Sequence, residues 1–371
     1  MAENTKRRKS DHINICLDQK SQAKVITTGF EDVRLIHRAL PEVDRESIDL
    51  ATKVFDHAFA APIIVGAMTG GTPEATKINS TIAEAVEKLG LGMGLGSQRA
   101  ALEDEKLEKT FSIARKKAPT AFLVANIGGI QLVKGYGVKE IRKAIEMIEA
   151  DAVAIHLNAL QETIQPEGQT SFKGIITRIG EIAGAIDQPV IVKETGAGIS
   201  AEDAKELESA GVKGIDVGGA GGTSFAAVEY YRASKEDNNQ RFLGEAFWDW
   251  GIPTIVSLVE VTKSVKLPVI ASGGLRSSVD IAKALSLNAC LASLSQPILS
   301  VAVKSAKDTE KSLSCLIEGL RNVMFLVGAQ KTSDLTEVPV VITGRTAEWL
   351  RTRNFQVEDY ATRGQRGTGN S

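Results

Sequence analysis

A short apolar run, a glycine or polar residue, and then a helical pattern recur eight times from Ala61 onward. Continuous apolar runs of this length are typical of parallel strands that are buried on both faces. Because eight alternating strands and helices close into a ring, the repeat predicts an α/β protein with a (β/α)8 TIM barrel. The predicted strands cover residues 62–67, 91–95, 121–126, 152–157, 189–193, 214–217, 268–272 and 290–294.

Capping residues mark the helices between these strands. Thr72 followed by Pro73 is a typical helix start, and Gly90 is a typical end, so a helix is expected between them. Ser200 similarly begins a helix that we expect to end at Gly211.

The repeat also divides the chain. Residues 1–60 precede it and are expected to form an N-terminal extension that covers the barrel mouth, residues 61–350 form the barrel, and residues 351–371 form a C-terminal tail. The connection over residues 223–267 is the one long irregular segment, so we expect a lid or an interface there.

Composition excludes several classes of protein. With 43% hydrophobic residues, 24% charged residues and a net charge of −2 in 371 residues, the chain has no charge excess that would attract nucleic acid. No apolar run reaches the ~18 residues that span a bilayer, and no signal-peptide core follows the charged start. The three cysteines share no metal-binding spacing. A reducing, cytoplasmic location is therefore expected.

Polar side chains follow the predicted strands at the end where barrel enzymes carry their active sites. The clearest case is residues 151–162 (DAVAIHLNALQE), where His156, Asn158, Gln161 and Glu162 follow a buried run. These groups can donate, accept and bind a cation. The alternative is a strand that enters a polar loop whose groups satisfy one another.

A second candidate site lies in residues 272–276 (SGGLR). Exposed N–H groups and the guanidinium of Arg276 ahead of a helix predict a phosphate site, although a tight turn that needs glycine would look the same. Lys193 ends a neighbouring strand, where it would neutralise a core carboxylate or stabilise negative charge on a planar cofactor. A phosphate site beside flat, glycine-lined space suits flavin mononucleotide (FMN).

Several motifs together identify a family. They are RKxxH from Arg8 to His12, FEDVRLIHRALP at residues 30–41, AMTGG at 67–71, GSQR at 96–99 and HLNxxQE at 156–162. In these motifs, and over nearly its whole length, the chain closely resembles the type 2 isopentenyl-diphosphate isomerases. The combination of HLNxxQE, GSQR and RKxxH is highly specific, whereas the glycine turns alone would fit any FMN-binding barrel.

The resemblance implies an enzyme of isoprenoid biosynthesis that interconverts isopentenyl diphosphate and dimethylallyl diphosphate. It implies reduced FMN as the agent that delivers and removes the proton, Mg²⁺ on the diphosphate, NADPH or NADH as reductant, and a homo-oligomer of four or eight subunits. If the segment after His156 is extended, Gln161 and its neighbour Glu162 face opposite ways, toward the double bond and the Mg²⁺ respectively.

The resemblance also carries roles to individual positions. Catalysis falls to Gln161, His156 and Asn158, and metal binding to Glu162. Diphosphate binding falls to Arg8, Lys9, Ser97, Gln98, Arg99 and Gln161. The FMN contacts would be Ala67, Met68, Thr69, Ser97, Asn126, Lys193, Thr223, Gly273, Gly274, Leu275, Arg276, Ser295 and Gln296.

Three positions depart from the family pattern. Gly218 replaces a small hydroxyl residue, Ser295-Gln296 replaces a more apolar pair, and Phe225 replaces a tryptophan. We expect the first two to reshape FMN binding and the third to change the size of an aromatic wall.

Two other functions fit parts of the sequence. An FMN-dependent hydroxy-acid oxidase or dehydrogenase would share the fold, but it needs a histidine base, and the ends of strands six and seven offer Thr223 and Arg276 instead. A non-catalytic sensor of prenyl diphosphates would keep the same pocket without turnover.

Overall fold

Eight parallel strands close a barrel in the order β10-β11-β4-β5-β6-β7-β8-β9. The computed structural model describes residues 2–18, 20–233 and 237–364. Every predicted strand is confirmed, and only β6 continues beyond its predicted end. The strands are β4 (Ile63–Val65), β5 (Gly92–Gly94), β6 (Phe122–Gly128), β7 (Ala152–His156), β8 (Val190–Lys193), β9 (Gly214–Asp216), β10 (Val269–Ala271) and β11 (Leu291–Leu294).

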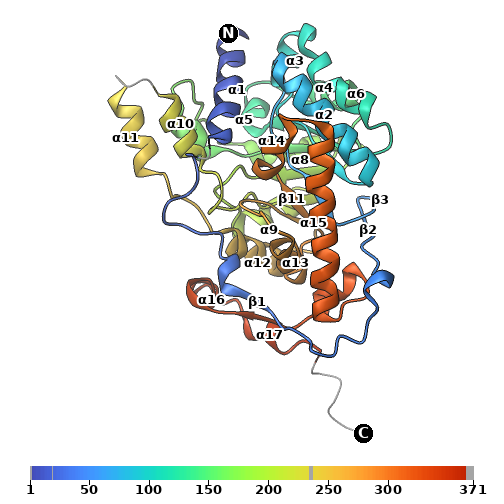
Figure 1. Ribbon diagram of the computed structural model, residues 1–371. Coiled ribbons are helices and arrows are strands. Elements are labelled where there is room, and N and C mark those ends of the chain that lie inside the picture. The colour runs from blue at the N-terminus through green and yellow to red at the C-terminus, as the bar shows by residue number, and fades with distance from the viewer. Residues whose placement is uncertain (1, 19, 234–236, 365–371) are drawn as a thin grey trace.

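Helices pack around the barrel, and their apolar faces bury its outer side (Figure 1). They are α2 (Pro73–Leu89), α4 (Lys109–Lys117), α6 (Val138–Ile148), α8 (Ile175–Ala183), α9 (Ala201–Ser209), α12 (Thr254–Ser264), α13 (Ser278–Ser286) and α15 (Ala306–Val327). Shorter helices follow several strands: α3 (Arg99–Glu103), α5 (Gly129–Val133), α7 (Ala159–Ile164), α10 (Phe225–Arg232), α11 (Asn238–Ala246) and α14 (Gln296–Ala302).

The predicted caps form. The hydroxyl of Thr72 accepts a hydrogen bond from the N–H of Ala75, and Gly90 ends α2 in the left-handed conformation with φ 62°. The hydroxyl of Ser200 likewise accepts from the N–H of Asp203 at the start of α9.

The N-terminal extension covers both ends of the barrel. Helix α1 (Ala2–Leu17) contacts α3, α10 and α14 at the mouth. The chain then runs along the strand-six turn, where Ser21 and Ala23 exchange backbone hydrogen bonds of 2.7 and 2.9 Å with Ser224 and Gly222. Strand β1 (Val33–Leu35) reaches the far end, where it pairs antiparallel with β12 (Val340–Ile342).

A hairpin closes the far end of the barrel. Strands β2 (Thr52–Val54) and β3 (His57–Phe59) place the rings of Phe55 and Phe59 against Phe122 of β6, with ring centroids 6.0 and 5.4 Å apart. Because this end is filled by aromatic side chains, only the opposite end is open to ligands.

The described part of residues 351–371 packs on the rest of the fold. Helix α16 (Gly344–Thr352) crosses the predicted boundary at residue 350, and α17 (Glu358–Ala361) follows it at the far end of the barrel (Figure 1). Within the described residues, no helix combines the length and the apolar character that a membrane span requires.

A buried carboxylate fastens this end to the barrel. Glu260 of α12 is 1% exposed and accepts hydrogen bonds from Arg353 Nε at 3.1 Å, Trp349 Nε1 at 3.3 Å and the N–H of Ala201 at 3.2 Å. Arg353 also donates to Glu202 at 2.6 Å on the surface. The guanidinium therefore supplies the charge that compensates the buried Glu260.

We expect Arg353→Met to lower the free energy of unfolding by about 3 kcal/mol, because it leaves Glu260 buried without a counter-ion while two neutral donors remain. Chemical denaturation measures this loss. Glu202→Gln is the control: it removes only the exposed partner of Arg353, and it should change stability little. Equal losses in the two variants would show that the buried carboxylate is not the group that matters.

Candidate active site

A cavity of about 300 Å³ opens at the carboxyl ends of the barrel strands beneath α1. This is the size range of small-molecule sites. All of the sequence-predicted site residues line it except Gln98. The strand ends and the N-terminal extension therefore line one cavity.

Gln98 lies behind the cavity. Its side chain is fully buried, its amide donates to the carbonyl of Ala144 at 2.8 Å, and its carbonyl accepts from the N–H of Asn126 at 2.9 Å. Both polar atoms are therefore used within the protein, and Gln98 does not line the cavity. It supports Asn126 instead.

Three cations lie along one side of the cavity. Arg8 and Lys9 come from α1, and Arg99 from the first turn of α3. Lys9 Nζ donates to the carbonyl of Ser97 at 3.0 Å. Burial lowers the pKa of Lys9 to about 7, and the charges of Arg8 and Arg99 act in the same direction. Positive charge is thus concentrated at this side of the cavity, and a bound anion would stabilise the charged form of Lys9.

His156 lies at the end of β7 with its ring fixed. Its Nδ1 donates to Asn126 Oδ1 at 2.8 Å, and the Asn126 amide donates to the carbonyl of Leu95 at 2.9 Å. Burial lowers the pKa of His156 to about 3, and Lys193, Arg8 and Lys9 add to the effect. The imidazole is therefore neutral, with Nε2 left as an acceptor.

Gln161 and Glu162 lie on helix α7, so the expectation of an extended segment here is wrong. The motif leaves β7 and turns at once into a helix, in which neighbouring side chains do not point opposite ways. The amide of Asn158 donates to both residues, to Gln161 Oε1 at 3.3 Å and to Glu162 Oε1 at 3.0 Å. The N–H of Gln169 donates to the second oxygen of Glu162 at 2.7 Å.

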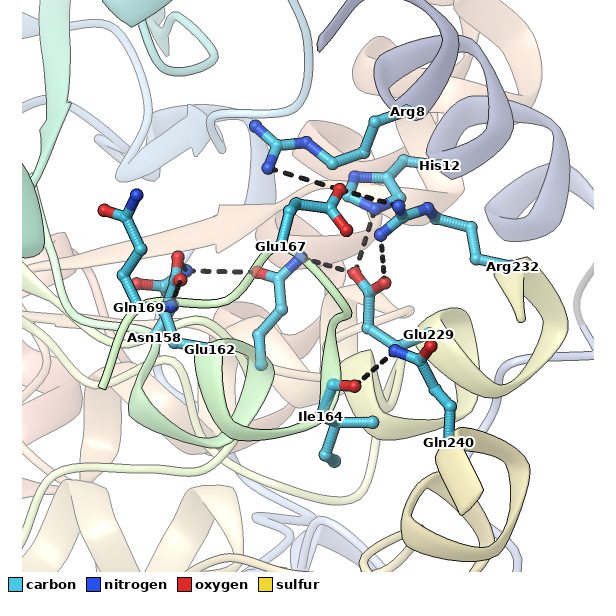
Figure 2. A network of polar contacts seen from close by, with 11 residues as sticks. Arg8, His12, Asn158, Glu162, Ile164, Glu167, Gln169, Glu229, Arg232 and Gln240 are labelled. Carbon is cyan, nitrogen blue, oxygen red and sulfur yellow. Dashed lines mark hydrogen bonds and ion pairs between the residues drawn. The ribbon is translucent and has the colours of Figure 1, made fainter. Parts of the chain in front are cut away.

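Figure 2 shows a polar network that links α1, α7 and α10. At its centre the fully buried carboxylate of Glu229 accepts from Gln161 Nε2 at 2.9 Å and contacts His12 Nε2 at 3.0 Å. Arg232 donates to the other oxygen of Glu229. Burial opposes ionisation, but the hydrogen bond and charge of His12, together with Arg232, lower the pKa of Glu229.

Lys193 lies among buried carboxylates at the ends of β8 and β9. Its Nζ donates to the carbonyl of Glu194 at 2.7 Å, and it is the strand neighbour of Asp216. Burial raises the pKa of Glu194 to about 7 and also raises that of Asp216, while the charge of Lys193 acts in the opposite direction on both. The charge of Lys193 therefore partly compensates two core carboxylates, which is one of the two roles predicted for it from the sequence.

The turn before α13 is built from two glycines and leaves backbone N–H groups unpaired among the described residues. Gly273 and Gly274 have φ of 101° and 74°, which disfavours any side chain there. Within the part of the chain that the structure describes, the N–H groups of Gly274 and Leu275 have no acceptor. Arg276 reaches over this turn and donates to the side chain of Gln22.

At Gly218 the backbone of this chain disfavours a side chain. Its φ is 49°, and a Cβ there would come within 2.2 Å of the carbonyl oxygen of Glu194. Phe225 lines the cavity as the predicted aromatic wall and meets the ring of His12 edge-on at 6.2 Å.

The residues that line the cavity are chemically suited to bind FMN and a polar substrate. The hydroxyl of Thr69 and Oδ1 of Asn158 are buried without a partner among the described residues, and both groups line the cavity. Together with the unpaired N–H groups beside Arg276, they leave donors and acceptors for polar ligands.

The main omissions of the sequence interpretation are Glu229, Arg232 and Asp216. The first two lie in the long connection, which was expected to be a lid or an interface but contributes helix α10 to the wall of the site. Asp216 could have been found, because it is a charged residue within the otherwise apolar predicted strand 214–217. Glu229 carries no local signal.

Comparison with known proteins identifies the family of the chain. The model of a family described as FMN-dependent dehydrogenase matches residues 1–124 and 139–341. Two solved mandelate oxidase structures, one with benzaldehyde and one with benzoyl-formic acid, superpose with TM-scores of 0.62 and 0.61 at 17% and 18% identity. Each covers 92% of this chain and 98% of the oxidase, which supports the barrel fold alone.

Curated relatives are much more similar in sequence. The isopentenyl-diphosphate delta-isomerase of Methanosarcina barkeri is 47% identical over 98% of this chain and 99% of its own length. Those of Methanothermobacter thermautotrophicus and Pyrococcus abyssi are each 48% identical, over 96% and 95% of this chain and over 99% and 96% of their own lengths. The chain belongs to the FMN-dependent dehydrogenase family and, within it, to the isopentenyl-diphosphate delta-isomerases.

Proposed function

We propose that the protein interconverts isopentenyl diphosphate and dimethylallyl diphosphate in a cavity that also holds reduced FMN and Mg²⁺. The observation that carries the proposal is the cluster of Arg8, Lys9 and Arg99 at one side of a cavity whose other side has the glycine turn and Arg276. Two separate cationic regions suit two phosphate-bearing ligands, a cofactor and a substrate.

The diphosphate would bind to Arg8, Lys9 and Arg99, with Ser97 and Gln161 beside it. Burial and the two neighbouring guanidinium charges depress the pKa of Lys9, so an anionic head group would restore its full charge. Charge-assisted hydrogen bonds from guanidinium and ammonium groups are the usual means of holding such a group.

FMN would lie over the remaining strand ends. Its phosphate would contact Gly273, Gly274, Leu275 and Arg276 together with Ser295 and Gln296, and Lys193 would lie near its ring, with Ala67, Met68, Thr69, Ser97, Asn126 and Thr223 lining the same space. When bound, FMN would supply the acid and base chemistry that moves the double bond.

The protein would orient the reacting carbons and exclude water. Gln161 is held from both sides, by Glu229 and by Asn158, so its amide has one fixed orientation. The neutral His156 is fixed by Asn126. Phe225 and Met68 add apolar surface, which protects charge that develops on the hydrocarbon from water.

Mg²⁺ would bind Glu162 together with oxygens of the diphosphate. In the described residues no group of three His, Cys, Asp or Glu side chains could hold a metal ion. A metal here therefore needs ligands from the substrate and from water, as is usual for Mg²⁺ on phosphates.

We also propose NADPH or NADH as the reductant, a cytoplasmic location and a homo-oligomeric state. The free thiols of Cys16, Cys290 and Cys315 fit a reducing compartment. Measured flavin reduction by each nucleotide and light scattering of the purified protein test the other two.

An isomerase assay tests the function directly. With FMN, Mg²⁺ and a reductant, isopentenyl diphosphate should convert to dimethylallyl diphosphate without net consumption of reductant, because the two share one oxidation state. Oxidised FMN under air should give no turnover. Oxidation of a hydroxy acid instead would favour the oxidase function, and binding of the diphosphate without conversion would favour a sensor.

The affinity for the diphosphate should depend on the protonation of Lys9. Its lowered pKa means that the free protein loses this charge above about pH 7, whereas the ligand favours the charged form. Binding should therefore take up a proton, and affinity should fall by up to about tenfold per pH unit between pH 7 and 9. Calorimetric titration at several pH values measures this. In Lys9→Arg, which stays charged, the added pH dependence should disappear, and its persistence would contradict the assignment.

Gln161 and Glu162 should respond differently to Mg²⁺ although Asn158 contacts both. Glu162→Gln removes a metal ligand and should show a defect that added Mg²⁺ partly rescues. Gln161→Ala should not be rescued, and it should lower kcat more than it raises KM, because an oriented amide acts mainly in the transition state. A Mg²⁺ titration of both variants decides: identical responses would mean that the pair forms one metal-bound unit.

A further inference from the structure

Two of the three cations at the diphosphate side of the cavity already carry a carboxylate partner. Arg8 Nη1 lies 3.7 Å from Glu167 Oε1, and Arg99 Nε donates to Glu103 Oε1 at 2.7 Å. Lys9, by contrast, donates to a backbone carbonyl. The side chains of Glu167 and Glu103 are 41% and 38% exposed, so both lie at the solvent edge of the site.

Glu167 has a second cation that holds it in place, and the backbone of α3 keeps Glu103 close to Arg99. Arg232 donates to Glu167 at 2.6 Å, and Arg232 is itself fixed by the buried Glu229, as Figure 2 shows. Glu103 lies one helical turn after Arg99 on α3. The contact between Arg8 and Glu167 is the longest of these, and a ligand can replace it while Glu167 stays in place.

We propose that Glu167 and Glu103 are resident counter-ions of the diphosphate site, which the bound diphosphate replaces at Arg8 and Arg99. This inference rests on the proposed function. In the free protein the two carboxylates hold the guanidinium groups at the edge of the cavity. In the complex they remain close to the phosphates as like charges and lower the affinity for them.

The consequence for turnover follows from the chemistry of the reaction. Substrate and product carry the same diphosphate, so an interaction with that group stabilises both equally and does not speed the chemical step. A site made only of cations would retain the product. Two fixed carboxylates reduce this retention while leaving the cations in place for binding.

The alternative is that the carboxylates merely orient the two arginines for the ligand. The two explanations predict opposite results. If orientation matters, replacing a carboxylate lets the arginine move and weakens binding. If charge matters, the same replacement strengthens binding, and it does so more for a ligand of higher charge.

The test is calorimetric titration of the full-length protein with inorganic pyrophosphate and with inorganic phosphate, at low salt and without added divalent cation. Glu167→Gln and Glu103→Gln keep the shape of the side chain, and in the first variant the new amide oxygen can still accept from Arg232. We expect each to lower the Kd for pyrophosphate about three- to tenfold. The gain for phosphate should be smaller, and both gains should shrink at high salt.

Two further variants serve as controls. Glu181→Gln removes the same charge from an exposed pair with Arg178, outside the cavity, and should leave the Kd unchanged. In an Arg8→Gln background the gain from Glu167→Gln should diminish, because the exchange takes place at Arg8.

The outcomes separate this inference from the function on which it rests. A wild-type protein that binds neither pyrophosphate nor isopentenyl diphosphate would contradict the proposed function itself. A wild-type protein that binds pyrophosphate, with Glu→Gln variants that bind it equally or more weakly, would contradict only the counter-ion role. An undiminished gain in the Arg8→Gln background would show that Glu167 does not act at Arg8.

Discussion

The ion and hydrogen-bond contacts of Glu229 hold together parts of the site that are far apart in the sequence. A fully buried carboxylate is costly unless donors surround it, and here His12, Gln161 and Arg232 supply them. Each donor comes from a segment that forms a different wall of the cavity. The contacts of Glu229 therefore couple three features of the site. They are the position of α1 over the mouth, the orientation of the Gln161 amide and the placement of α10.

The two ends of the barrel have different roles. At the far end, Phe55, Phe59 and Phe122 fill the opening with aromatic rings, and Glu260 fastens α16 beside it. The mouth contains the open cavity. Some of the groups that line it lack a hydrogen-bond partner or a full complement of opposite charge within the protein. Stability and ligand binding are thus concentrated in separate layers of the same fold, as is general for this architecture.

The barrel was predictable because its signals are local. Each strand is a buried apolar run, and caps such as Thr72 and Gly90 lie within a few residues of the helices that they end. The residues at the strand ends could be assigned to one site for the same reason. The regular fold then brings them together.

What the sequence could not reveal depends on contacts over long separations. In the sequence Gln98 cannot be told apart from a glutamine that binds a ligand. Only its hydrogen bonds with Ala144 and Asn126 show that its side chain supports the protein structure. The helix at Gln161 does have local helix formers in residues 159–162. The side-chain contacts of Gln161 with Asn158 and with Glu229 of α10 carry no such local signal. In the sequence Glu229 looks like any charged residue on a surface helix, because its burial depends on the packing of α1 over it.

The location of α1 also has a consequence for how the protein is made. Arg8 and Lys9 on α1 precede by far in the sequence the helix α14, against which α1 packs and which ends at Ala302. Helix α1 therefore cannot reach its final position until α14 has been synthesised. A nascent chain that ends before α14 lacks this packing surface, so the wall of the cavity that α1 forms is completed only after α14 has been made.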